Sequence, residues 1–235
     1  MKKTVLITGG NKGIGLEVTR ELLQKDYKII VIARDFNNFE FKNNSDVKMI
    51  EFDLSKIEDI PDLIASLDKL ANIDILINNA GMMYSVPYNQ YTIEQQTSIM
   101  KLNLESPIKL IEEISKNMLK NGSGRIVNNA SIAGQIGHPD IWYGMSKAGL
   151  INATKSFSKI FEGNIIINAV APSPVETDML HTIPKQRRDA FLQTVITKRF
   201  ATASEIAKTI VWLATDSPEY INGSCIDINN GSFPR

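Results

Sequence analysis

Short runs of apolar and β-branched residues alternate along the chain with longer stretches in which apolar residues recur at helical spacing. The short runs predict strands, and several are apolar at almost every position, which is typical of parallel strands buried on both faces of a sheet. Seven strands are predicted, over residues 4–8, 28–33, 47–52, 73–77, 125–129, 165–170 and 224–228.

The longer stretches predict amphipathic helices over residues 13–25, 57–70, 92–120, 143–161 and 203–214. Repeated strand–helix–strand units indicate an α/β fold, in which a doubly wound parallel sheet of about seven strands carries helices on both faces. No linker-like composition and no internal repeat divides the chain. We therefore expect one domain over residues 1–235.

Two segments interrupt this alternation. Residues 35–46 are rich in asparagine and too short for a clear crossover helix. Residues 172–200 contain three prolines and an irregular apolar pattern, which predicts a loop with short helices. This loop follows the sixth predicted strand and should lie over the carboxyl edge of the sheet, where ligands bind in open α/β folds. Residues 173–200 are thus expected to form a substrate lid.

Composition excludes several classes of protein. Lysine plus arginine equals aspartate plus glutamate, 26 each, so no net field attracts nucleic acid or anionic lipid. The apolar runs are far shorter than the roughly 20 residues that span a bilayer, so no membrane partner is expected. One cysteine, Cys225, excludes an internal disulfide framework and favours a cytoplasmic location. Cys225 is expected to be a small buried residue in a strand.

A glycine-rich turn follows the first predicted strand and begins the first predicted helix, with glycines at positions 9, 10, 13 and 15. Glycine allows tight backbone angles and lets a diphosphate approach the main chain without a side-chain collision. The N–H groups and the helix dipole at Ile14 and Gly15 then favour an anion. The turn predicts a dinucleotide site, although a glycine-rich turn without a ligand has the same local pattern.

Tyr143 and Lys147 are four residues apart, and Ser131 precedes Tyr143 by twelve residues. Residues at i and i+4 share a helix face, so Lys147 can lie beneath Tyr143. A nearby ammonium, and the positive nicotinamide of an oxidised cofactor, favour the phenolate and lower a pKa that is otherwise about 10. In the reduction of a carbonyl, Tyr143 is expected to donate a proton to the oxygen while Ser131 positions that oxygen.

These motifs, in this order, resemble those of the short-chain dehydrogenase/reductase family. The family's turn reads Thr-Gly-x-x-x-Gly-Ile-Gly, as at 8–15, and its Asn-Asn-Ala-Gly signature matches residues 78–81. Asn103 matches the family's helix asparagine, and residues 170–177 resemble the segment that contacts the nicotinamide. The matches extend over nearly the whole chain, so the resemblance implies a Rossmann-type fold.

The resemblance also implies roles for individual residues. The implied catalytic set is Asn103, Ser131, Tyr143 and Lys147. Lys147 is implied to bind the nicotinamide ribose, and Asn103 to hold a water that resupplies the proton. The implied cofactor-binding residues are Gly9, Asn11, Lys12, Gly13, Ile14, Gly15, Arg34, Asp53, Leu54, Asn79, Ala80, Gly81, Tyr143, Lys147, Pro172, Val175 and Thr177.

The second predicted strand ends in Ala33-Arg34-Asp35, which bears on the choice of cofactor. The 2′-phosphate of NADP is matched by a cation, and the free ribose hydroxyls of NAD by a carboxylate. Arg34 and Lys12 follow the family's NADP pattern, and a planar guanidinium can bind a phosphate bidentately. We therefore expect NADP(H) in preference to NAD(H); the alternative is a solvated Arg34 with Asp35 on the ribose.

The predicted function is NADPH-dependent reduction of a carbonyl, and 3-oxoacyl-acyl-carrier-protein reductases have the most similar general pattern, in part because residues 199–231 follow theirs. A reductase or dehydrogenase of another alcohol, sugar or cyclic ketone is the alternative, and a sensor without catalytic activity is a third. The resemblance implies a homotetramer, or failing that a homodimer, with the predicted helices 92–120 and 143–161 at the main interface. No cysteine–histidine cluster has zinc spacing, so no catalytic metal is expected.

Four other side chains have two interpretations each. His138 could line the substrate pocket or lie in an exposed loop. His181, Arg187 and Arg188 fall on the expected lid and could meet an anionic substrate or carrier, or form a solvated helix face.

Overall fold

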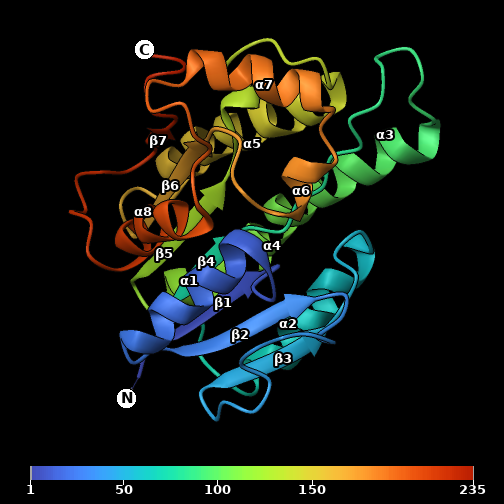
Figure 1. The fold of residues 1–235 in the computed structure, drawn as a ribbon. Coiled ribbons are helices and arrows are strands. Elements are labelled where there is room, and N and C mark those ends of the chain that lie inside the picture. Colours follow the sequence, from blue (N-terminus) through green and yellow to red (C-terminus); the bar gives the residue numbers. More distant parts are fainter. Residues whose placement is uncertain (1, 235) are drawn as a thin grey trace.

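A computed structural model describes residues 2–234 and contains one seven-stranded sheet in the order β3-β2-β1-β4-β5-β6-β7, with every pair of neighbours parallel (Figure 1). The predicted fold class is confirmed. The strands are β1 Thr4–Thr8, β2 Lys28–Ala33, β3 Val47–Glu51, β4 Ile75–Asn78, β5 Gly124–Asn129, β6 Ile165–Pro172 and β7 Cys225–Ile228. Every residue of β1, β4 and β6 is buried, which explains why these strands are mostly apolar and do not alternate with polar residues.

Helices cover both faces of the sheet. α1 (Gly13–Gln24) and α8 (Ala203–Thr215) pack on one face, in the core that contains Ile7 and Val31. α2 (Ile60–Asp68), α4 (Ser106–Lys120) and α5 (Ile141–Ile160) pack on the other. Because neighbouring side chains of a strand point to opposite faces, β1 and β2 supply both cores. In the described part of the chain, no helix is both long and apolar enough to cross a membrane.

The helix predicted over residues 92–120 is not continuous. It consists of α3 (Ile93–Met100), a π-helical turn (Lys101–Glu105) and α4. Pro107 lies in the first turn of α4 and has no N–H to donate to the carbonyl of Asn103, four residues earlier. The π-turn accommodates this loss, since the N–H of Ser106 bonds to the carbonyl of Lys101 instead. The turn places the side chain of Asn103 in the interior.

The segment 173–200 leaves the carboxyl end of β6 and contains the short helices α6 (Asp178–His181) and α7 (Lys185–Thr194), as its prolines predicted. Its two ends are joined, because Val175 pairs with Ala201 in an isolated β-bridge. The start of the segment is also tied to β7, since the N–H of Ser173 donates to the carbonyl of Ile228 at 3.0 Å.

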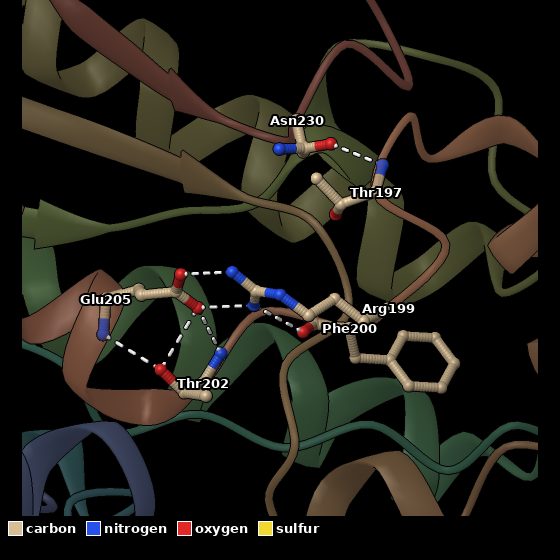
Figure 2. A network of polar contacts seen from close by, with 6 residues as sticks. All are labelled: Thr197, Arg199, Phe200, Thr202, Glu205 and Asn230. Atoms are coloured by element: carbon tan, nitrogen blue, oxygen red, sulfur yellow. Dashed lines mark hydrogen bonds and ion pairs between the residues drawn. The ribbon is translucent and has the colours of Figure 1, made fainter.

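A polar network fixes the other end of the segment (Figure 2). The two terminal guanidinium nitrogens of Arg199, Nη1 and Nη2, donate to the carboxylate of Glu205 at 2.8 and 2.6 Å. Glu205 also completes a capping box with Thr202 at the start of α8. The arginine and the Thr202 donors hold the pKa of Glu205 at about 2. Asn230 accepts the backbone N–H of Thr197 at 2.9 Å, which ties the same end to the C-terminal segment.

Two local predictions are corrected. α5 begins at Ile141 and not at Tyr143, because Asp140 caps its first turn. Cys225 lies in a strand as predicted but is only half-buried, since β7 is the edge strand of the sheet and all four of its residues are partly exposed.

Candidate functional site

The chain passes from β1 through β2 to β3 at one edge of the sheet and then returns to the other side of β1 with β4. The glycine turn follows β1, at this reversal of strand order, which is the position where α/β sheets bind ligands. Gly9 has a φ of 64°, in the left-handed region that favours glycine. A Cβ atom on Gly15 would lie 2.0 Å from the carbonyl oxygen of Gly9, so this position cannot carry a side chain without opening the turn. The turn therefore packs directly against the N-terminus of α1.

Asn79 and Thr8 fix the shape of this turn. The hydroxyl of Thr8 accepts the backbone N–H groups of Asn79 and Ala80, at 2.9 and 3.0 Å. The side-chain amide of Asn79 donates to the carbonyls of Thr8 and Gly9, both at 3.1 Å, and its oxygen accepts from Asn129 at 3.0 Å. The carboxyl ends of β1, β4 and β5 are therefore joined by polar side chains.

The residues present fit the diphosphate of a dinucleotide. Lys12 is the N-cap of α1 and makes no side-chain capping bond, and the first turn holds no acidic residue. The first N–H groups of a helix have no intrahelical partner and attract an anion together with the helix dipole. A Cβ on Gly13 would lie 3.3 Å from Cγ2 of Thr177, so the segment after β6 passes over this end of the turn.

At the end of β2, Arg34 and Asp35 are exposed. Neither Arg34 nor Lys12 forms an ion pair with any residue in the range 2–234. Asp53 accepts the N–H and the hydroxyl of Ser55, at 3.0 and 2.8 Å. These bonds, with the nearby charge of Arg34, lower the pKa of Asp53.

Two other predicted cofactor residues are held by contacts of their own. The side chain of Leu54 is buried in the core that also contains Leu6 and Ile32. Asn11 donates from its side chain to the carbonyl of Asp35 at 2.9 Å, which joins the glycine turn to the end of β2.

Tyr143 and Lys147 share a face of α5, as their spacing predicted. The ammonium of Lys147 lies 5.8 Å from the centre of the Tyr143 ring. Lys147 is 4% exposed and donates to the carbonyl of Asn129 at 2.8 Å. Burial lowers its pKa to about 8. A Cβ on Gly81 would lie 3.5 Å from the Lys147 nitrogen, so the turn after β4 reaches this lysine directly.

Ser131 ends the loop after β5, where its hydroxyl accepts the N–H of Ala133 at 3.1 Å and lies 3.5 Å from the carbonyl of Pro172. Burial raises the pKa of Tyr143, a hydrogen bond with Ser131 opposes this rise, and the charge of Asp140 adds to it. The sequence predicted that Lys147 would lower the pKa of Tyr143, but the protein groups around Tyr143 raise it. Burial, which the sequence could not reveal, is the larger effect.

Asn103 is fully buried in the π-turn, and its side chain is committed to protein partners. Its oxygen accepts the N–H of Met82, and its amide donates to the carbonyl of Met82, both at 2.9 Å. The amide also lies 3.2 Å from the hydroxyl of Ser146 on α5. Asn103 thus joins the segment after Gly81 to the helix that carries Tyr143 and Lys147.

The weaker candidates lie at different distances from this group. His138 is half-buried, with its ring centre 5.6 Å from that of Tyr143. Arg188 contacts His181 at 3.4 Å in the segment 173–200, where His181 is exposed and Arg187 and Arg188 are half-buried on a helix with no buried residue. Among residues 2–234, no three histidine, cysteine, aspartate or glutamate side chains are grouped as metal ligands.

One residue of this region was missed by the sequence analysis. Asp140 is fully buried and accepts the backbone N–H of Tyr143 at 3.0 Å. Its residue type and its position just before an apolar run are the signal of an N-cap, which could have placed the start of α5 correctly.

Residues 3–188 match the family model described as short chain dehydrogenase. The 3-oxoacyl-acyl-carrier-protein reductase of Staphylococcus epidermidis is 28% identical over 99% of this chain and 100% of its own. The acetoacetyl-CoA reductase of Rhizobium meliloti is 30% identical, over 99% of this chain and 98% of its own.

Two solved structures have the same fold. ElxO with NADP bound has a TM-score of 0.89 and 29% identity, with 99% of each chain covered. 4-Hydroxyisoleucine dehydrogenase complexed with NADH has a TM-score of 0.92 and 28% identity, with 98% of each chain covered. This chain belongs to the short-chain dehydrogenase family and is an oxidoreductase.

Proposed function

We propose that this protein reduces the carbonyl of a 3-oxoacyl thioester to an alcohol, with NADPH as the hydride donor. The observation that carries this proposal is the arrangement of Ser131, Tyr143 and Lys147 at the carboxyl edge of the sheet, next to the turn that begins α1. Gly81, in the turn after β4, connects the cofactor turn with the catalytic group, since it lies against both Asn103 and Lys147. Relatives named as 3-oxoacyl and acetoacetyl-CoA reductases support the class of substrate.

The bound cofactor supplies a hydride to the carbonyl carbon. Tyr143 donates its phenolic proton to the carbonyl oxygen, so that one hydride and one proton convert C=O to CH–OH. Its raised pKa keeps the phenol protonated at neutral pH, which suits a proton donor. Ser131 donates a hydrogen bond to the same oxygen and positions it. Lys147 lies beneath the phenol, where its charge stabilises the phenolate left after transfer.

The choice of NADPH rests on Arg34 and Lys12, two exposed cations near the end of β2 and the start of α1. Arg34→Ala is expected to raise the KM for NADPH about ten-fold or more, because a hydrogen bond between charged groups contributes about 1.5–3 kcal/mol. The KM for NADH should change little. Lys42→Ala removes an exposed cation from the same crossover and is the matched control. Equal effects of Arg34→Ala on both cofactors would remove this assignment.

Oxidation of NADPH in the presence of an acetoacetyl thioester, with NADH in parallel, tests the function as a whole. Turnover that prefers NADPH supports the reaction and the substrate class together. If NADPH binds but no thioester is reduced, this substrate class is wrong, and other alcohols, sugars and cyclic ketones come next. Binding without turnover over a broad panel of carbonyl compounds would point to a sensor without catalytic activity.

The segment 173–200 and the assembly belong to the same proposal. We assign the segment the role of a substrate lid, because it directly follows Pro172, which lies beside Ser131, and passes over Gly13. We assign the protein to the cytoplasm as a homotetramer, with a homodimer as the smaller alternative. Exposed Ile141 and Met145 on α5 favour self-association, since they present an apolar face to solvent. The mass of the assembly in solution tests this assignment.

A further inference from the structure

Asp140 is a fully buried carboxylate at the start of α5. One of its oxygens accepts the backbone N–H of Tyr143 at 3.0 Å, and the other lies 3.3 Å from the N–H of Ser85. No ion pair joins it to a cation among residues 2–234. A buried charge held by neutral donors is costly, so a role beyond helix capping is worth testing.

Asp140 connects the start of α5 to the chain that follows β4. Ser85 has a φ of 56°, a strained value for a residue other than glycine, and its N–H points to Asp140 in this conformation. Burial, and then the Asp140 carboxylate, raise the pKa of Tyr91, which packs edge-on against Tyr84 at 6.3 Å. The residues that follow Gly81 are therefore gathered around this one carboxylate.

The backbone of Asp140 holds the ring of His138. Nδ1 of His138 lies 3.1 Å from the N–H of Asp140 and 3.2 Å from its carbonyl oxygen, so either tautomer of the ring finds a partner there. Burial lowers the pKa of His138, which keeps the ring neutral near pH 7. The ring is thus held beside Tyr143, with 5.6 Å between the two ring centres.

We propose that Asp140 is a positioning residue of the reaction: its carboxylate caps the first turn of α5 and so aims Tyr143, its backbone holds the His138 ring against Tyr143, and its negative charge lies next to the residue that donates the proton. The inference rests on the proposed function, because it concerns the same proton donor. The charged and titratable groups around Tyr143 are Asp140, His138 and Lys147, with Tyr91 and Arg187 further out. Of these, Asp140 is the group whose charge opposes the phenolate.

Two variants separate charge from geometry. Asp140→Asn keeps an oxygen that caps α5 and removes the charge, and asparagine caps helices as well as aspartate does. Asp140→Ala removes both. Without the charge, the Tyr143 pKa should fall, because the Asp140 carboxylate is one of the groups that raise it. Asp140→Asn should therefore keep the melting temperature and NADPH binding, and shift the decline of kcat with rising pH to lower pH. Asp140→Ala should lower kcat about ten-fold or more at unchanged KM for NADPH.

Ultraviolet titration of the Tyr143 phenolate, taken as the difference between each protein and its Tyr143→Phe counterpart, reads the same shift without any substrate. If no carbonyl is reduced by the wild-type protein, this titration still decides the inference while the proposed function fails. Asp62→Asn, in the first turn of α2, is the control for loss of a helix-start carboxylate. An unchanged Tyr143 titration in Asp140→Asn overturns the role of the charge, and full kcat in Asp140→Ala overturns the positioning role.

Discussion

Replacing Tyr143 with phenylalanine is expected to lower kcat by about 10²–10⁴-fold or more while the affinity for NADPH stays within about two-fold. The change removes only the hydroxyl, so the ring still packs against His138 and above the Lys147 ammonium. The variant has no phenolic proton to donate to the carbonyl oxygen, but it keeps every contact that shapes the glycine turn. Steady-state kinetics and cofactor fluorescence measure the two quantities on the same preparation.

Tyr27→Phe is the matched control, because Tyr27 is partly buried against the core around α1 and far along the chain from Ser131. It should leave kcat unchanged. Substantial residual turnover in Tyr143→Phe would mean that another group donates the proton, and His138 is then the first candidate. Loss of NADPH binding would instead show that the phenol supports the cofactor site.

Replacing Lys147 with methionine is expected to stabilise the folded protein while it abolishes turnover. The Lys147 pKa falls from 10.5 to about 8 on burial, which corresponds to a cost of about 3 kcal/mol for keeping the ammonium charged at neutral pH. The variant also loses the hydrogen bond to the carbonyl of Asn129, which lowers its stability by about 1 kcal/mol. The net gain of about 2 kcal/mol should raise the melting temperature by about 4–8 °C.

The pH dependence of this gain follows from the direction of the shift. Below pH 8 the lysine is charged in both the folded and the unfolded states, so the folded state carries the full cost. As the pH rises from 8 to 10.5, the folded lysine loses its proton first and the wild-type protein recovers stability. The advantage of Lys147→Met should therefore shrink across this range. Lys155→Met, at an exposed position on the same helix, should show neither effect.

The parallel sheet could be predicted from the sequence because strands such as β1 and β6 are mostly apolar and show no alternation of polar and apolar residues, which is typical of strands buried on both faces. The helical stretch over residues 93–120 was predicted, but the π-helical turn inside it was not, because the apolar pattern continues through Asn103 while Pro107 removes the hydrogen bond that a regular helix needs there. That proline was the available signal.

Burial of individual polar groups could not be predicted in the same way. The sequence placed Tyr143 above Lys147 from their spacing alone, and the distance of 5.8 Å agrees. The direction of the Tyr143 pKa depends on how deeply the phenol lies and on Asp140, which reaches it only after the start of α5 is folded. Local patterns report which residues share a face, and tertiary packing sets their electrostatics.

The bridge between Val175 and Ala201 means that the segment between them begins and ends at neighbouring points of the sheet edge. Insertions or deletions inside it leave the register of every strand unchanged, since no strand lies within it. A change in the length of this segment can therefore alter what covers the site while the strands and helices that carry Ser131, Tyr143 and Lys147 stay in place.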